Sequence, residues 1–373
     1  MPTRRAFALV VLALLLVANR ADAFPSLAAV VDRARAHGPS VVLAGADITV
    51  AAATRHAAGL APLTNPYAEI IAERGKYTED AAITGSLYLP FELSGQRSAR
   101  IGEVNALMRW KTAARASAAA AAIGEAVSAY GENVVAAARL REAGEGERVA
   151  REEATYIGGR LAVGDATSVD QALADGETAR WLQSKSEAEV ALSLAHARLA
   201  IALGDARLDV PSEVDVVDLP RLRSSNAQAQ AERLRVTSPA LLAPTLEASY
   251  FAATRQRLEA EKYPPLNIIL RGGRGDLGEA RFGGGLAWTF PFLRSNQGEI
   301  ARAGAEEVRA LTSRSIVAGA LDARLTGLSA AYEVVSRAVA STDAVAIPAS
   351  ETVVEACVRA WKAGKLDLQR VFL

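Results

Sequence analysis

The chain has 373 residues, with 42 Lys and Arg residues against 42 Asp and Glu residues, and half of its residues are apolar. This neutral balance argues against a nucleic-acid partner, which usually requires a basic excess. A single cysteine, Cys357, excludes an intramolecular disulfide framework, and three histidines argue against a Cys/His metal cage. The apolar content also argues against a disordered chain.

Residues 1–23 are predicted to form a secretion signal. Arg4 and Arg5 precede an apolar run at 6–18, and Ala21 and Ala23 supply small residues before a cleavage point at Phe24. The alternative, a membrane anchor, is disfavoured because this run is too short to span a bilayer. The protein is therefore expected to be exported.

The sequence repeats itself at an offset of about 200 residues. The sequence Ala-Ala-Thr-Arg at 52–55 recurs at 252–255, and the Leu-Pro-Phe sequence at 89–91 matches Phe-Pro-Phe at 290–292. These matches predict two copies of one unit, at 24–204 and 226–373, joined by a linker at 205–225. The second copy stops about 30 residues earlier than the first, so we expect it to be truncated in its last helix.

Two segments of alternating apolar and polar residues occur in each copy, within about 67–92 and about 266–292. Alternation with a period of two predicts strands with one apolar face. The apolar positions include Leu87, Leu89, Leu286 and Trp288, and the opposing positions include Thr84, Ser86 and Arg281.

A helical period follows each strand pair. We expect long helices over 94–203 in the first copy, and the helical rise gives about 105 Å for 94–163 alone. Ser94 and Ser295 are predicted helix N-caps. Gly144 and Gly146 in one copy, and Pro348 in the other, are predicted to interrupt the helices. The spacing of apolar residues predicts a coiled-coil seam through Leu321, Leu325, Leu328, Tyr332, Val335 and Val339.

Strands of about ten residues with one apolar face have the length of tilted transmembrane β-strands. In lipid, the edges of a sheet must close because no water is present to satisfy unpaired backbone groups. Four strands do not close a barrel alone, so several protomers would contribute four each. The alternative is a small soluble sheet that caps a helical bundle.

Four stretches of the sequence carry a resemblance to a known family: 63–66, 91–97, 161–164 and 288–292. In this order, and with the internal repeat, the chain resembles the TolC-like outer membrane efflux proteins, particularly the heavy-metal and drug efflux members. The resemblance implies a mainly α fold with a transmembrane β part, and a homotrimer with a 12-stranded barrel and a periplasmic helical tunnel. It also implies a location in the outer membrane, with a periplasmic adapter and an inner-membrane pump as partners.

No catalytic constellation is found in the sequence, so we expect neither an enzyme nor a cofactor. The glycines at 272–275 lack the Lys-Ser/Thr of a phosphate loop and are interpreted as a hairpin turn. The predicted function is passive conduction through the exit duct of a tripartite efflux or type I secretion system. The alternative is a periplasmic coiled-coil adapter of such a system, but two hairpins and two strand pairs favour the duct.

The turns between paired helices are the predicted functional sites. The adapter-docking tips are expected at Val163, Gly164 and Asp165 in one copy and at Ala363, Gly364 and Lys365 in the other. Asp165, Asp170 and Asp367 are candidates for a ring of acidic side chains in the pore. Leu87, Leu89, Leu286 and Trp288 are the predicted lipid-facing residues. No metal ligands are expected.

Overall fold

The computed structural model describes residues 26–62, 64–74, 76, 81–205, 224–293 and 295–363. The predicted secretion signal and nearly all of the linker at 205–225 lie outside the described residues. The chain divides into two compact units. The helical unit comprises Met1–Val41, Ala119–Ala231 and Leu325–Leu373, and the strand unit comprises Val42–Ala118 and Glu232–Arg324.

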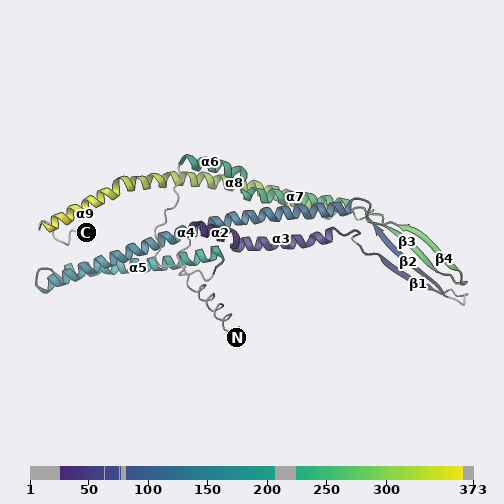
Figure 1. Cartoon of the computed structure of the whole chain (residues 1–373), viewed down its shortest axis with the longest axis horizontal. Coiled ribbons are helices and arrows are strands. Elements are labelled where there is room, and N and C mark those ends of the chain that lie inside the picture. The colour runs from purple at the N-terminus through teal and green to yellow at the C-terminus, as the bar shows by residue number, and fades with distance from the viewer. Residues whose placement is uncertain are drawn as a thin grey trace, which may run out of the picture. The chain divides into compact units, whose positions relative to one another are not determined.

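One antiparallel sheet characterises the strand unit. It consists of β1 (Tyr67–Glu73), β2 (Ala82–Phe91), β3 (Leu266–Arg274) and β4 (Ala280–Ala287), in the order β1-β2-β3-β4 (Figure 1). The strand pairs of the two copies therefore join through β2 and β3. The four predicted strands are present, but β4 ends before Trp288, which was wrongly placed within it. The pairing of β4 stops near the start of its partner β3, which begins directly after Pro264 and Pro265.

The strand register gives the sheet one apolar and one polar face. Leu87 of β2 lies opposite Ala68 of β1 and Leu270 of β3, and Leu270 lies opposite Gly284 of β4. Because side chains alternate along a strand, these residues define the apolar face. Its larger members are Ile70, Ile83, Leu87, Leu89, Phe91, Leu266, Ile268, Leu270, Phe282 and Leu286. The polar face includes Glu69, Glu73, Thr84, Ser86, Tyr88, Asn267, Arg271 and Arg281.

The helices of the strand unit are α3 (Pro39–Ala58), α7 (Pro239–Ala260) and the first parts of α4 (Gln96–Ala162) and α8 (Gln297–Ser341). The predicted caps Ser94 and Ser295 are wrong, because Gly95 and Asn296 precede the first helical residues. Their carbonyls accept hydrogen bonds from Ala99 and Ile300, at 3.0 and 2.9 Å. Both have positive φ angles, of 70° and 60°, a conformation that favours glycine and asparagine over serine.

In the helical unit, α2 (Leu27–His37) and α5 (Ser168–Leu203) pack with the second part of α4. The sequence pattern did not predict α2 as a separate helix. Tyr130 and Asn133 of α4 and Leu199 of α5 are fully buried. Asn133 Nδ2 donates to the carbonyl of Ala195 at 2.7 Å, which ties α4 to α5 through a side chain within an otherwise apolar core. The helix α6 (Ser224–Thr237) precedes α7 in the second copy. Among the described helices, none is long and apolar enough to cross a membrane.

The predicted helix interruptions at Gly144 and Gly146 are wrong, because α4 passes through both residues without a break. Gly146 instead makes room for Trp181 of α5, because a Cβ atom at position 146 would lie 2.3 Å from Trp181 Cε3. The absence of a side chain therefore lets the indole ring lie against the α4 backbone. Near Pro348, the helix changes to a five-residue π-helix (Thr342–Ala346) and continues as α9 (Ile347–Lys362).

Gly146→Ala is expected to destabilise the α4–α5 hairpin, because the added methyl group would displace Trp181. Gly144→Ala is the matched control, since a Cβ there has no neighbour within 4 Å. By helix propensity alone, each substitution should stabilise a helix by about 0.8–1 kcal/mol. Thermal unfolding should thus show opposite signs for the two variants, and a stabilised Gly146→Ala protein would contradict the close contact with Trp181.

Candidate functional sites

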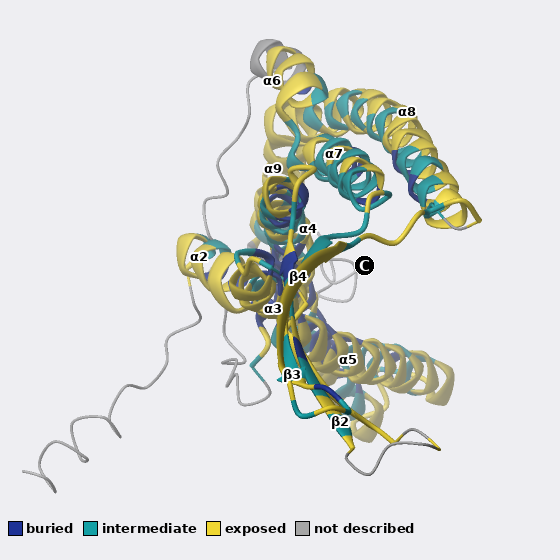
Figure 2. Ribbon diagram, turned by 90° about the vertical axis from the view of Figure 1, so that its right-hand side faces the viewer, coloured by how far each residue is buried: buried dark blue, intermediate teal, exposed yellow. Residues whose placement is uncertain are grey.

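The apolar face of the sheet is solvent-exposed in the single chain, and β4 is exposed along nearly its whole length (Figure 2). Phe282 is 88% exposed, Ile70 78% and Leu286 69%. A contiguous apolar surface of this kind usually marks contact with a membrane or a partner. Leu87, Leu89 and Leu286, three of the predicted lipid-facing residues, share this face. Trp288 lies one residue beyond β4, where its Nε1 donates to the carbonyl of Pro264 at 3.2 Å. That these residues touch lipid remains a prediction.

The polar face carries paired side chains of both charges. The Tyr88 hydroxyl donates to Glu69 Oε2 at 3.0 Å, and the Tyr67 and Tyr88 rings stack with their centroids 4.3 Å apart. At the β3–β4 turn, Arg281 Nε donates to Glu279 Oε1 at 2.7 Å. The predicted polar positions Thr84, Ser86 and Arg281 lie on this face. The surface is thus polar and mixed in charge.

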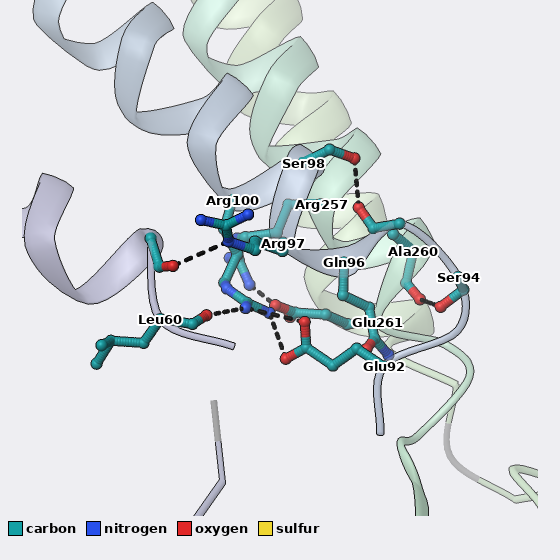
Figure 3. Close-up of polar contacts among 12 residues, drawn as sticks. Leu60, Glu92, Ser94, Gln96, Arg97, Ser98, Arg100, Arg257, Ala260 and Glu261 are labelled. Carbon is teal, nitrogen blue, oxygen red and sulfur yellow. Dashed lines mark hydrogen bonds and ion pairs between the residues drawn. The ribbon is translucent and has the colours of Figure 1, made fainter. Parts of the chain in front are cut away.

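A polar junction connects the strands to the helices of the same unit (Figure 3). Its centre is Arg100 of α4, whose Nη1 lies 3.0 Å from Glu92 Oε1 and whose Nη2 donates to the carbonyl of Leu60 at 2.8 Å. The side chains of Arg100 and Glu92 are only 7% and 10% exposed. Because Leu60 follows α3 and Glu92 follows β2, one guanidinium group holds three segments together.

The second copy meets the same junction through α7. Ser94 Oγ donates to the carbonyl of Ala260 at 2.9 Å, and Asn296 Nδ2 donates to the carbonyl of Leu258 at 3.2 Å. Arg257 forms ion pairs with Glu103 at 2.7 Å and with Glu261 at 2.6 Å. The stretch at 91–97 carried part of the family resemblance, but sequence reasoning missed these contacts. Ser94 and Ala260, for example, are 166 residues apart along the chain.

The hairpin tip between α4 and α5 is closed at both ends by local hydrogen bonds. Gly164, with a φ angle of 84°, donates to the carbonyl of Leu161 at 3.1 Å, and Asp165 donates to that of Arg160 at 2.9 Å. This pair of bonds is a Schellman motif, which requires a left-handed residue at Gly164. Val163 is 73% exposed. The tip therefore presents an apolar side chain on a well-defined turn.

Thr167 and Asp170 form a capping box at the start of α5. The Asp170 carboxylate accepts hydrogen bonds from the Thr167 hydroxyl at 2.7 Å and its backbone N–H at 2.8 Å. These bonds hold the pKa of Asp170 below its usual value. Asp165 is exposed at the same turn, whereas Gly364, Lys365 and Asp367 lie outside the described residues. Ala363 is exposed directly after α9.

Farther along the same hairpin, Glu147 of α4 accepts a hydrogen bond from Lys185 of α5 at 2.9 Å. This bond is the main reason that the pKa of Glu147 is lowered, and Arg151 adds to the effect. The contact ties the two helices together at neutral pH. Within the part of the chain that the structure describes, no group of three His, Cys, Asp or Glu side chains could hold a metal ion.

The fold, with its amphipathic four-stranded sheet and long helical hairpin, is similar to that of solved outer-membrane channels. Three solved structures illustrate the likeness. OprN, an outer-membrane channel, is 17% identical, with a TM-score of 0.65 and coverage of 94% of this chain and 86% of that one. The Campylobacter jejuni channel CmeC is 17% identical, with a TM-score of 0.64 and coverage of 93% and 78%. CusC is 13% identical, with a TM-score of 0.65 and coverage of 93% and 84%.

These TM-scores show a common fold, which confirms the mainly α chain with a four-stranded antiparallel sheet that was expected from the sequence. No protein-family model matches the chain, and comparison with curated protein sequences finds no match.

Proposed function

We propose that this protein is the outer-membrane exit duct of a tripartite efflux or type I secretion system, and that it conducts substrates passively. The observation that carries the proposal is the sheet, which has a continuous apolar face, exposed in the single chain, opposite a polar face. Alternation of this kind suits a barrel wall between lipid and a water-filled lumen. The fold shared with outer membrane channels favours this function over a periplasmic adapter.

The open edges of the sheet support a closed ring of copies, and the resemblance to TolC-like proteins implies three. Among the described residues, β1 and β4 each pair with only one neighbouring strand, so each has an unpaired edge. In a membrane these edges must find partners, because lipid offers none for backbone N–H and C=O groups. Three copies in a ring would give 12 strands and a closed barrel, continued in the periplasm by helices. Leu87, Leu89 and Leu286 would then face lipid.

Conductance tests this proposal directly. The full chain, purified in detergent, should have the native mass of a trimer and should insert into planar lipid bilayers with stepwise ion conductance. Detergent without protein is the control. A folded monomer that never conducts would contradict the duct, and an adapter would give that result.

We further propose that the hairpin tips dock a periplasmic adapter. The first tip comprises Val163, Gly164 and Asp165, and the second comprises Ala363, Gly364 and Lys365. The proposal is supported by the ordered Schellman turn, which presents Val163 to solvent in a fixed position. A small residue at the turn lets another helical hairpin approach closely, and an exposed valine offers it apolar contact.

Val163→Asp is expected to abolish export while trimer assembly continues, because a carboxylate would have to lose its water in the docked state. Val190→Asp is the matched control, since Val190 lies on α5 away from the tip and is 61% exposed. The measurement is substrate export from cells that contain the adapter and pump, together with the native mass. Gly164 is a poorer target, because its positive φ angle would strain any larger residue.

If the Val163→Asp protein exported normally, or if both variants failed alike, the tip would not be the docking site.

Within the same proposal, Asp165 is the best candidate for an acidic ring at the tip, since the Asp170 carboxylate already caps α5. Asp367 is the corresponding candidate in the second copy.

A further inference from the structure

An arginine marks one end of the apolar face. Arg274 is the last residue of β3, and it is the only charged residue on this face among the residues of the four strands. Its Cα partner on β2 is Ile83, which in turn pairs with Ala72 of β1. The face is thus uncharged from its helix end up to this last row of residues.

The first copy repeats the same feature. Arg74 directly follows β1, and strand alternation places position 74 on the same face as Ala72, two residues earlier. Arg74 and Arg274 are separated by the repeat offset of about 200 residues, and both are exposed. Each copy of the repeat therefore ends its apolar face with an arginine at the same end of the sheet.

Aromatic residues mark the opposite end, near the helices. Phe91 pairs with Leu266, and the neighbouring rings of Trp288 and Phe290 lie 4.9 Å apart. From Phe91 to Ile83 there are eight residue steps, or about 27 Å at ~3.4 Å each. If the strands tilt by about 40° from the barrel axis, this length extends roughly 21 Å along the membrane normal, which is close to the ~25 Å apolar band of outer-membrane barrels. The arginines thus lie at the depth where lipid headgroups begin.

We propose that Arg74 and Arg274 bind the phosphate of an anionic lipid headgroup at the outer rim of the membrane. The proposal rests on the function proposed above, because it needs the apolar face to lie in lipid. A guanidinium group matches phosphate oxygens through paired hydrogen bonds, and its aliphatic stem packs on apolar surface while the charge reaches the interface.

The β3–β4 turn is built to accommodate this arginine. Gly278 has a φ angle of 83°, and a Cβ atom there would lie 3.2 Å from Arg274 Nη2, so the guanidinium passes beside a residue without a side chain. The acidic residues of the turn, Asp276 and Glu279, form ion pairs with Arg281, which belongs to the polar face. Both carboxylates thus contact an arginine of the polar face.

The test is lipid retention by the full chain in detergent micelles, measured by native mass spectrometry. The probes are phosphatidylglycerol, diacylglycerol with the same acyl chains, and inorganic phosphate. The wild-type protein should retain phosphatidylglycerol, and Arg74→Gln/Arg274→Gln should lower this affinity about tenfold or more. Arg271→Gln is the matched control, because it removes an arginine from the polar face of β3 and leaves the β3–β4 turn unchanged. Arg74→Lys/Arg274→Lys should bind more weakly than the wild-type protein but more tightly than the Gln variant, because it keeps the charge and loses the paired hydrogen bonds.

Three results would overturn the proposal: equal retention by the Arg74→Gln/Arg274→Gln and wild-type proteins, equal binding of diacylglycerol, or binding of inorganic phosphate without lipid. The last result would indicate an ion site and not a lipid site. Conductance of the wild-type protein separates the two proposals. A conducting trimer that does not prefer phosphatidylglycerol to diacylglycerol would contradict only the lipid site. A non-conducting monomer would contradict both the exit duct and the lipid site.

Discussion

Arginine in place of Leu87 is expected to destabilise the membrane-inserted protein by about 2–4 kcal/mol. Leu87 lies near the middle of β2, and its neighbours across the strands are Ala68 and Leu270. No charged strand residue of the apolar face lies close to it, so a guanidinium there would have to enter hydrocarbon or drag water with it. The free energy of unfolding should be measured by denaturant titration of the protein in lipid vesicles.

Thr84→Arg is the matched control for this substitution. Thr84 belongs to the same strand but to the polar face, opposite Ile71 and Gly273. In the proposed barrel it faces water, where a charge costs little, so the loss of stability should be much smaller. Equal losses for the two variants would show that both faces meet the same environment and would contradict the assignment of lipid to the apolar face.

Removal of the Arg100 side chain is expected to cost about 3–5 kcal/mol, because it leaves the Glu92 carboxylate nearly buried without its charge partner. The same change also removes the hydrogen bond to the carbonyl of Leu60. The Arg100→Ala protein should therefore unfold at lower denaturant concentration than wild type.

Two comparisons isolate the charge effect. Glu92→Ala/Arg100→Ala removes both charges, so it should be less destabilised than the sum of the single variants predicts. Lys111→Ala removes a more exposed ion pair to Asp47, whose side chain is 57% exposed, and should cost no more than about 1 kcal/mol. A small effect at Arg100, similar to that at Lys111, would mean that the junction does not hold the segments together.

The sheet could be predicted from the sequence because alternation is a local property. Ile83, Leu87 and Leu89 fall on one face by counting alone, and the observed register agrees with that count. The end of β4 could not be counted in this way, since the Trp288 side chain continues the alternation although the strand pairing stops at Ala287. Backbone pairing depends on a neighbouring strand, which the sequence of one segment does not contain.

Glycine was the residue most often misread. The sequence predicts helix breaks at Gly144 and Gly146, but a long helix tolerates glycine at a modest cost, and Gly146 is explained by the distant Trp181. The sequence also predicts Ser94 as the cap, whereas Gly95, the next residue, adopts the left-handed conformation. The junction around Arg100 depends on segments far apart in sequence, so no local pattern could indicate which carboxylate and carbonyl it meets.

The π-helix at Thr342–Ala346 has a consequence for the phase of the helix that contains it. The apolar seam of α8 repeats every seven residues, as from Leu328 to Val335 and from Tyr332 to Val339. Two more steps of seven from Val339 would reach Ala346 and Val353. The bulky Ile347 instead comes one residue late, and Val354 follows it after seven more. A π turn takes up one extra residue, whereas in an α-helix that residue would rotate every later side chain by about 100°. Ile347 and Val354 therefore return to the azimuth of Val339, and a helix lying along this side would meet apolar side chains both before and after the π turn.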